Sequence, residues 1–169
     1  YYITTPLLMR FLEENLPVDT MVVMVQREVA QRMTARPGTK EYGALSVAIQ
    51  LRANVELVTV VSPHVFFPKP AVESAVVRLS LRPLPDVVKD EAFLFAVVRA
   101  AFAQRRKTVR NALKSAVKPA GAGAGLWTEL AVEPALAAAG IDGGRRGETL
   151  SEEEFIRLAN ELAMLAGAG

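Results

Sequence analysis

Two closely spaced prolines, Pro83 and Pro85, separate two kinds of hydrophobic pattern in this chain. Three mainly apolar runs of strand length precede them, at residues 21–25, 55–61 and 75–81. After the prolines, apolar residues recur at helical spacing throughout. Because proline lacks a backbone donor and interrupts regular structure, the pair marks a linker. The sequence therefore predicts an α/β region at residues 1–83 and a small all-helical region at residues 86–169.

The first region has the predicted order helix, strand, helix, helix, strand, loop and strand. Pro6 can begin the first helix, and Asn15 and Pro17 end it. The run at 21–25 is apolar at every position, which is typical of a strand covered on both faces in a parallel sheet. The two later runs are expected to pair as a hairpin around the proline-containing loop at 62–70. This alternation resembles the second half of a doubly wound sheet, without a glycine-rich strand-to-helix turn for a cofactor.

Helical periodicity in the second region covers residues 93–102, 109–117 and 130–139. The last helix is predicted to begin at Ser151, because Glu154 follows at the spacing of a capping box. Two apolar stripes should be buried, one in the first helix of the chain and one in the last: Leu7, Leu8, Phe11 and Leu12, and Phe155, Leu158, Leu162 and Leu165.

Composition excludes several kinds of site. The chain has no cysteine, so disulfides and thiolate zinc sites are impossible, and its one histidine makes a histidine-based metal site or triad an unfavourable interpretation. We therefore expect no metal. No apolar run approaches the roughly 20 residues that span a bilayer, so we expect no membrane contact and a cytoplasmic location.

The formal net charge is only +2, but the charges are unevenly distributed. Residues 92–128 contain no Asp or Glu. Seven basic residues fall in the same stretch: Arg99, Arg105, Arg106, Lys107, Arg110, Lys114 and Lys118. Such a run is consistent either with a solvated helix face or with contact to phosphate groups.

The loop between the two later runs has the sequence SPHVFFPKP. One interpretation is an ordinary connection between strands, with buried aromatic residues. The other is a proline-stiffened loop that presents Phe66 or Phe67 as a flat surface. A nucleobase stacked on such a surface gains about 1–3 kcal/mol.

Six segments occur in order along the chain: YYITTP, QREVAQRM, PGTKEYGALSV, FFPKPAVESAVVRL, FAQRRKTVRNAL and GETLSEEEF. Together they resemble the ribosomal RNA adenine N6-dimethyltransferases, which use S-adenosylmethionine to convert adenosines in rRNA to N6,N6-dimethyladenosine. The resemblance covers essentially the whole chain. Within the family, the tail with RRKTVRNAL and RGETLSEEEF is more similar to the small-subunit (16S) enzyme than to the large-subunit enzymes of macrolide resistance.

The resemblance implies the C-terminal half of a Rossmann-like S-adenosylmethionine methyltransferase sheet, followed by a helical rRNA-binding domain. Tyr1 matches the tyrosine of the family's Asn-Leu-Pro-Tyr motif, and the sequence begins inside that motif. The cofactor-binding residues would then lie upstream of Tyr1, with none in this chain. We therefore expect these 169 residues alone to be inactive. We also expect them to self-associate through an exposed sheet edge.

The resemblance also implies roles for individual residues. The target adenine would stack on Tyr1 on one face and on Phe66 on the other, with Phe67 the second choice. The family's Asn side chain and Pro carbonyl would hold the amine hydrogens, so no strong general base is needed. The partner would be 16S rRNA in the 30S ribosomal subunit precursor. RNA contacts would come from nine basic residues: Arg27, Arg32, Arg36, Lys40, Lys69, Arg105, Arg106, Lys107 and Arg110.

Three alternatives remain open on the sequence. The first is a large-subunit rRNA adenine methyltransferase of the macrolide-resistance type, with the same chemistry on a different RNA. The second is a non-catalytic RNA-binding module that assists ribosome assembly. The third is a stable helical domain with an attached half-sheet and no activity. The residues preceding Tyr1 would decide between an enzyme and a binding module.

Overall fold

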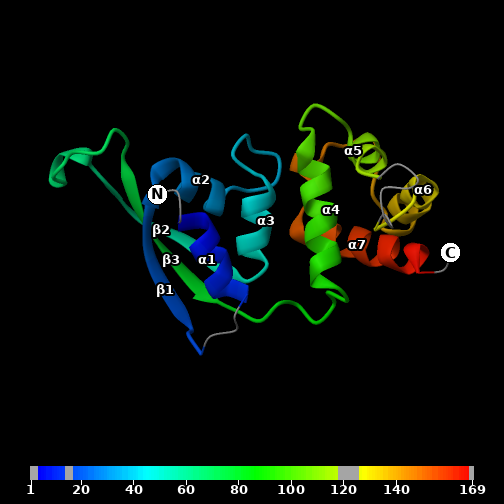
Figure 1. Ribbon diagram of the computed structural model, residues 1–169, viewed down its shortest axis with the longest axis horizontal. Coiled ribbons are helices and arrows are strands. Elements are labelled where there is room, and N and C mark those ends of the chain that lie inside the picture. The colour runs from blue at the N-terminus through cyan, green and yellow to red at the C-terminus, as the bar shows by residue number, and fades with distance from the viewer. Residues whose placement is uncertain (1–3, 14–16, 118–125, 168–169) are drawn as a thin grey trace. The chain divides into compact units, whose positions relative to one another are not determined.

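The computed structural model describes residues 4–13, 17–117 and 126–167 (Figure 1). The chain divides into two compact units. Unit 1 comprises Tyr1–Arg36 and Glu41–Leu84, and unit 2 comprises Pro37–Lys40 and Pro85–Gly169. The prediction of an α/β part followed by an all-helical part is confirmed by the element order.

Unit 1 contains a three-stranded antiparallel sheet with the order β1-β3-β2. The strands are β1 (Thr20–Gln26), β2 (Ala53–Val61) and β3 (Ser74–Leu81). The predicted hairpin is confirmed, because β2 and β3 pair directly on either side of the proline-containing loop. The pairing of β2 with β3 shifts register between Leu57 and Thr59, where the ladder is irregular.

The expectation for the run at 21–25 is wrong in one respect. Strand β1 pairs antiparallel with β3, and its burial alternates along the strand. Val25 is fully buried, whereas Val22 is 63% exposed and Met24 is 49% exposed. The reason is that the helices of this unit gather on one side of the sheet (Figure 1), so only alternate side chains of β1 are covered in the described structure.

Three helices cover that side: α1 (Thr4–Glu13), α2 (Arg27–Thr34) and α3 (Ala44–Gln50). The core between helices and sheet is built from ten buried residues: Leu8, Leu12, Val25, Ala30, Met33, Ile49, Ala53, Ala75, Val77 and Leu79. The predicted stripe of α1 is therefore half right. Leu8 and Leu12 are buried, but Leu7 and Phe11 are exposed. The predicted stop at Asn15 lies outside the described residues.

Unit 2 contains the helices α4 (Glu91–Ala103), α5 (Val109–Ser115), α6 (Glu129–Ala138) and α7 (Glu152–Ala166). Asp90, Thr108 and Ser151 cap α4, α5 and α7, because their side-chain oxygens accept backbone N–H groups of the first turn. In α7, Phe155, Leu158 and Leu162 are buried as predicted. Leu165 is 36% exposed, which corrects the prediction, because it lies in the last turn, beyond the final buried position.

The loop Pro37–Lys40 belongs to unit 2, although the sequence pattern places it in the first region. The backbone N–H of Gly38 donates to the carbonyl of Glu148 at 2.7 Å. The Arg105 guanidinium donates to the carbonyl of Lys40 at 2.8 Å. Gly38 has a φ of 86°, a conformation that glycine adopts without steric cost. These distant contacts cannot be read from local sequence.

Two 3-10 turns, η1 (Pro63–Val65) and η2 (Gly147–Thr149), also lie outside the predicted elements. Both are three residues long, so neither produces a measurable hydrophobic period. The predicted capping box is confirmed at the start of α7, where the Ser151 N–H donates to the Glu154 carboxylate at 2.9 Å.

A first prediction concerns Glu154, whose carboxylate also accepts from Arg145 at 3.0 Å. The hydrogen bond from Arg145 is the largest cause that lowers the pKa of Glu154 below its ordinary value. We expect Glu154→Gln to reduce the free energy of unfolding at pH 7 by about 1–3 kcal/mol, because a charge-assisted bond is lost.

The pH dependence of this effect follows from the direction of the shift. A lowered pKa in the folded state stabilises the protein above the unfolded-state pKa, and this stabilisation is lost as the pH falls through the folded-state pKa. Urea unfolding at pH 7 and at about pH 3, below the ordinary Glu value, should therefore show a larger loss of stability in Glu154→Gln at pH 7 than at pH 3. Glu153→Gln is the matched control, because Glu153 is exposed in the same helical turn. Equal losses for both variants at pH 7 would contradict the prediction.

Candidate functional site

The loop between β2 and β3 is fixed by its own short-range hydrogen bonds. Ser62 Oγ accepts the backbone N–H of His64 at 3.3 Å, and the Phe66 N–H donates to the Pro63 carbonyl at 3.3 Å. The Phe67–Pro68 peptide bond is cis. This loop forms the projecting end of the β2–β3 hairpin (Figure 1). Because these hydrogen bonds and three prolines restrict the backbone, the loop is an ordered connection between β2 and β3.

The two adjacent phenylalanines of this loop differ in exposure. Phe66 is half-buried, whereas Phe67 is 102% exposed. The interpretation in which both aromatic residues are buried is therefore wrong for Phe67. Tyr1, the predicted partner of Phe66 across the target base, lies outside the described residues.

Arg27 holds the base of the loop. Its guanidinium forms an ion pair with Glu73, and its backbone N–H donates to the Glu73 carbonyl at 3.0 Å. Arg32 is paired with Glu28 at 2.7 Å within the same helix. Two of the predicted RNA-binding cations of unit 1 thus already have carboxylate partners. Of the other two in this unit, Arg36 is exposed and Lys69 is exposed on the loop itself.

A turn between α4 and α5 collects three of the predicted cations. Arg105, Arg106 and Lys107 are all exposed there, and they line a surface hollow together with Ala103 and Gln104. The turn is closed by a hydrogen bond from the Lys107 N–H to the Gln104 carbonyl at 2.9 Å. Consecutive exposed cations on a defined turn are suited to phosphate oxygens.

Lys40 lies beside this turn, because its carbonyl accepts the bond from Arg105. The sequence pattern places Lys40 in the first region, with the strands, but its contacts group it with the helical unit instead. Arg146, which sequence reasoning missed, is exposed near the same turn. Arg145, which precedes Arg146, accepts the N–H of Val109, the first residue of α5, through its carbonyl at 2.7 Å. The Arg145–Arg146 pair was visible in the sequence, but its proximity to the turn was not.

We call these five residues the basic turn surface: Lys40, Arg105, Arg106, Lys107 and Arg146.

Arg110, the remaining predicted cation, has a different environment. Its Nε lies 2.7 Å from a carboxylate oxygen of Glu133, and Lys114 Nζ lies 3.2 Å from the same oxygen. The hydrogen bond from Lys114 is the largest cause that lowers the pKa of Glu133. Although residues 92–128 lack acids, helix α6 supplies one from beyond that range. The α5 cations Arg110 and Lys114 are thus partly neutralised.

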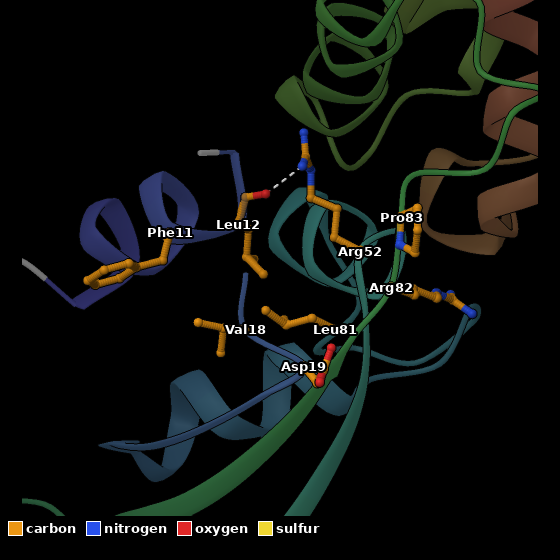
Figure 2. A pocket seen from close by; sticks show the side chains of 8 residues that line it. All are labelled: Phe11, Leu12, Val18, Asp19, Arg52, Leu81, Arg82 and Pro83. Atoms are coloured by element: carbon orange, nitrogen blue, oxygen red, sulfur yellow. Dashed lines mark hydrogen bonds between the residues drawn. The ribbon is translucent and has the colours of Figure 1, made fainter. Parts of the chain in front are cut away.

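A second hollow lies in unit 1 between the end of α1 and the ends of β1 and β3 (Figure 2). Arg52 is buried there and donates to the Leu12 carbonyl at 2.5 Å. The carbonyl of Arg52 in turn accepts the Arg82 N–H at 2.8 Å. These bonds tie helix α1 to the end of the sheet, so Arg52 has a structural role.

The described residues do not fit a nucleoside cofactor. Within residues 4–13, 17–117 and 126–167, no strand is followed by a glycine-rich turn that opens a helix, where doubly wound sheets bind such groups. In the same part of the chain, no three acidic or histidine side chains gather as a metal site. None of the described helices is long and apolar enough to cross a membrane.

Sequence comparison identifies relatives over nearly the whole chain. The family model described as ribosomal RNA adenine dimethylase matches residues 1–163. A protein of Alkaliphilus metalliredigens named ribosomal RNA small subunit methyltransferase A is 51% identical over 164 residues, which cover 96% of this chain and 55% of the relative. A Bacillus cereus protein of the same name is 53% identical over 165 residues, covering 97% and 55%. The chain thus spans about half the length of these curated relatives.

Solved structures confirm the fold class. A dimethyladenosine transferase from Plasmodium falciparum superposes with a TM-score of 0.76 at 23% identity, covering 94% of this chain and 62% of that one. The 23S rRNA methyltransferase ErmE gives a TM-score of 0.59 at 26% identity, covering 96% and 62%. Because the family model and the close relatives each match almost the entire chain, this chain belongs to the ribosomal RNA adenine dimethylase family.

Proposed function

We propose that this chain serves S-adenosylmethionine-dependent dimethylation of adenosine N6 in 16S rRNA of the small-subunit precursor, in the cytoplasm. The observation that carries this proposal is the identity of 51% and 53% to relatives named as small-subunit methyltransferases. Proteins this similar over nearly the whole of this chain are expected to share their substrate class. The exposed basic turn surface supports it, because an enzyme acting on rRNA must bind phosphates.

The two units would divide the work. We assign presentation of the target base to residues 1–83, through Phe66 and the proline loop, and rRNA binding to residues 86–169 together with Lys40. No residue of this chain is assigned to cofactor binding. Arg27 becomes a positioning residue of the loop in addition to its predicted RNA contact, because it is paired with Glu73 at the loop base.

The chemical task of the loop follows from the nucleophile. The N6 amine of adenine is weakly nucleophilic, because its lone pair is conjugated with the ring. S-Adenosylmethionine supplies the methyl group when it is bound. A base taken out of the RNA must be held with N6 in a fixed position, and a flat side chain on a rigid loop does this by stacking. Phe66 would hold one face, and Tyr1 would hold the other.

A methylation assay tests the substrate. A full-length protein that carries this chain should transfer methyl groups to small-subunit particles and not to naked 23S rRNA. The reverse preference would favour a large-subunit enzyme, the alternative that the fold similarity to ErmE keeps open. RNA binding without methyl transfer to either substrate would favour a non-catalytic assembly module.

A second prediction concerns the 169 residues by themselves. Calorimetric titration of S-adenosylmethionine into this chain should give no heat of binding, because the described strands offer no turn of the cofactor-binding type. A chain of verified intact mass is needed for the measurement. Micromolar binding would contradict the assignment of Phe66 and its loop to the target base, since a cofactor site would then lie among these residues.

A third prediction concerns the edge of β1. This strand pairs only with β3 within the described structure, and Val22 and Met24 are exposed on its uncovered face. An unpaired, flat and apolar edge strand promotes pairing with a second chain. We expect the 169-residue chain to form dimers or larger species by light scattering. Val22→Lys should shift it towards monomer, because a charge would be forced into the paired sheet.

Val87→Lys is the control for that experiment, because Val87 is 62% exposed in the other unit. It adds the same charge and should leave association unchanged. A monodisperse monomer for the unsubstituted chain would remove the edge-pairing proposal.

A further inference from the structure

Phe67 is an unusual surface residue. Its side chain is 102% exposed, more than any other large hydrophobic residue in the described structure. A fully exposed phenyl ring gains nothing from packing within its own chain. On a loop, such a ring is a flat surface on which another planar group can stack.

The loop holds Phe67 in this exposed position. Ser62 caps the preceding 3-10 turn, and the Phe66 N–H is bonded to the Pro63 carbonyl. Pro68 and Pro70 restrict the backbone on the other side. At its base, Glu73 is bound to both the side chain and the N–H of Arg27. The loop backbone is therefore already ordered before a partner binds. Less conformational entropy is lost on binding, so even a single ring can contribute substantially to the affinity.

The charge of the loop indicates the kind of partner. Residues 62–72 contain no Asp or Glu, and the next acid, Glu73, is neutralised by Arg27. Lys69 lies on the loop with its Nζ 3.5 Å from His64 Nε2. An exposed aromatic ring beside a cation, without acids, matches the way proteins bind single-stranded nucleic acid by base stacking and phosphate contact.

We propose that Phe67 stacks on an unpaired base of the RNA that neighbours the target adenosine, with Lys69 contacting the adjoining phosphate. This inference rests on the proposed function and extends it. Phe66 is half-buried directly after the 3-10 turn, and it keeps its assigned role of stacking on the target base. Phe67 points to solvent one residue later and is free to hold a second nucleotide. The loop would then fix two positions of the substrate instead of one.

Binding of a short single-stranded RNA that contains 2-aminopurine tests the proposal. The unsubstituted chain should quench the 2-aminopurine emission. Phe67→Ala should weaken binding by about 5- to 150-fold, the effect of losing one stacked base, and should abolish the quenching. Val65→Ala is the matched control, because Val65 is exposed on the same loop but cannot stack. It should change neither quantity.

Phe67→Trp supplies a second readout. It should retain the affinity, and the emission of the new Trp should be quenched by RNA. The native Trp127 is buried, so the unsubstituted chain provides the fluorescence baseline. An equal loss of affinity for single-stranded and fully paired RNA in Phe67→Ala would overturn the stacking role, because paired bases offer no free face.

Two further outcomes separate this inference from the proposed function. If Phe67→Ala binds RNA normally while charge reversal in the basic turn surface weakens binding, the role of Phe67 is wrong and the proposed function stands. If the unsubstituted chain binds neither single-stranded nor paired RNA, the role of Phe67 is overturned, and the methylation assay with the full-length protein decides the proposed function separately. If Phe67→Ala weakened binding to a protein or to lipid vesicles and left the affinity for RNA unchanged, the proposal would likewise be overturned.

Discussion

Reversal of two charges in the basic turn surface, Arg105→Glu with Arg106→Glu, is expected to weaken rRNA binding by about 100-fold at physiological salt. Both side chains are exposed on the turn between α4 and α5. Phosphate contacts release counterions, so their loss should also reduce the slope of log affinity against log salt by about 2, one for each contact. Filter binding or anisotropy over a range of salt concentrations would measure both quantities.

A matched control changes the same charge elsewhere in unit 2. Lys89→Glu with Arg99→Glu alters two exposed cations outside the basic turn surface. This variant should lose much less affinity and keep a steeper salt dependence. Equal weakening by both double variants would mean that only the net charge matters. Unchanged affinity in the Arg105/Arg106 variant would exclude the turn from RNA binding.

Arg110→Glu should have a smaller effect than reversal at Arg106. Arg110 already lies 2.7 Å from the Glu133 carboxylate, so a phosphate would have to compete with that partner. This comparison distinguishes a cation with a nearby carboxylate from one that is exposed on the turn. A larger loss at Arg110 would indicate that RNA displaces Glu133.

Phe66→Ala should reduce methylation by about 100-fold in a full-length protein that carries this chain, because a small displacement of the reacting base is enough to lower the rate that much. The affinity for S-adenosylmethionine should stay within about twofold, since no residue of the loop is assigned to the cofactor. Single-turnover methylation and calorimetry give the two quantities separately. Phe66→Tyr should restore most of the rate, because the ring is retained.

Val65→Ala on the same loop is again the control, and it should leave the methylation rate unchanged. Parallel loss of cofactor affinity and rate in Phe66→Ala would show that Phe66 supports folding rather than the target base. Thermal unfolding of the variant identifies that case directly. A normal methylation rate in Phe66→Ala would remove Phe66 from the site.

Interactions between residues close in sequence were predicted well. Ser151 and Glu154 form their capping box, because both hydrogen bonds span only three residues. The prolines at 63, 68 and 70 exclude regular structure over the whole of the loop, and β2 and β3 pair on either side of it. The six ordered segments were enough to identify the family.

Contacts between residues far apart in sequence were not predictable in this way. Lys40 groups with the helical unit because Arg105 binds its carbonyl, and Glu133 neutralises Arg110 from another helix. Arg146 adjoins the basic turn because the carbonyl of Arg145 accepts the Val109 N–H. None of these pairs has a local signal, since the intervening chain sets their distance.

The burial of side chains shows the same difference between local patterns and distant contacts. Local patterns in the sequence are enough to predict which segments are helices and strands, where α7 begins, and that a strand-bearing part precedes a helical part. They do not predict which face of each element is covered, because that depends on packing in the folded chain. Val22, Met24, Phe11 and Leu165 are as apolar as their buried neighbours, yet they are exposed. The physical reason is that periodicity depends on one segment, whereas burial depends on the second surface that packs against it.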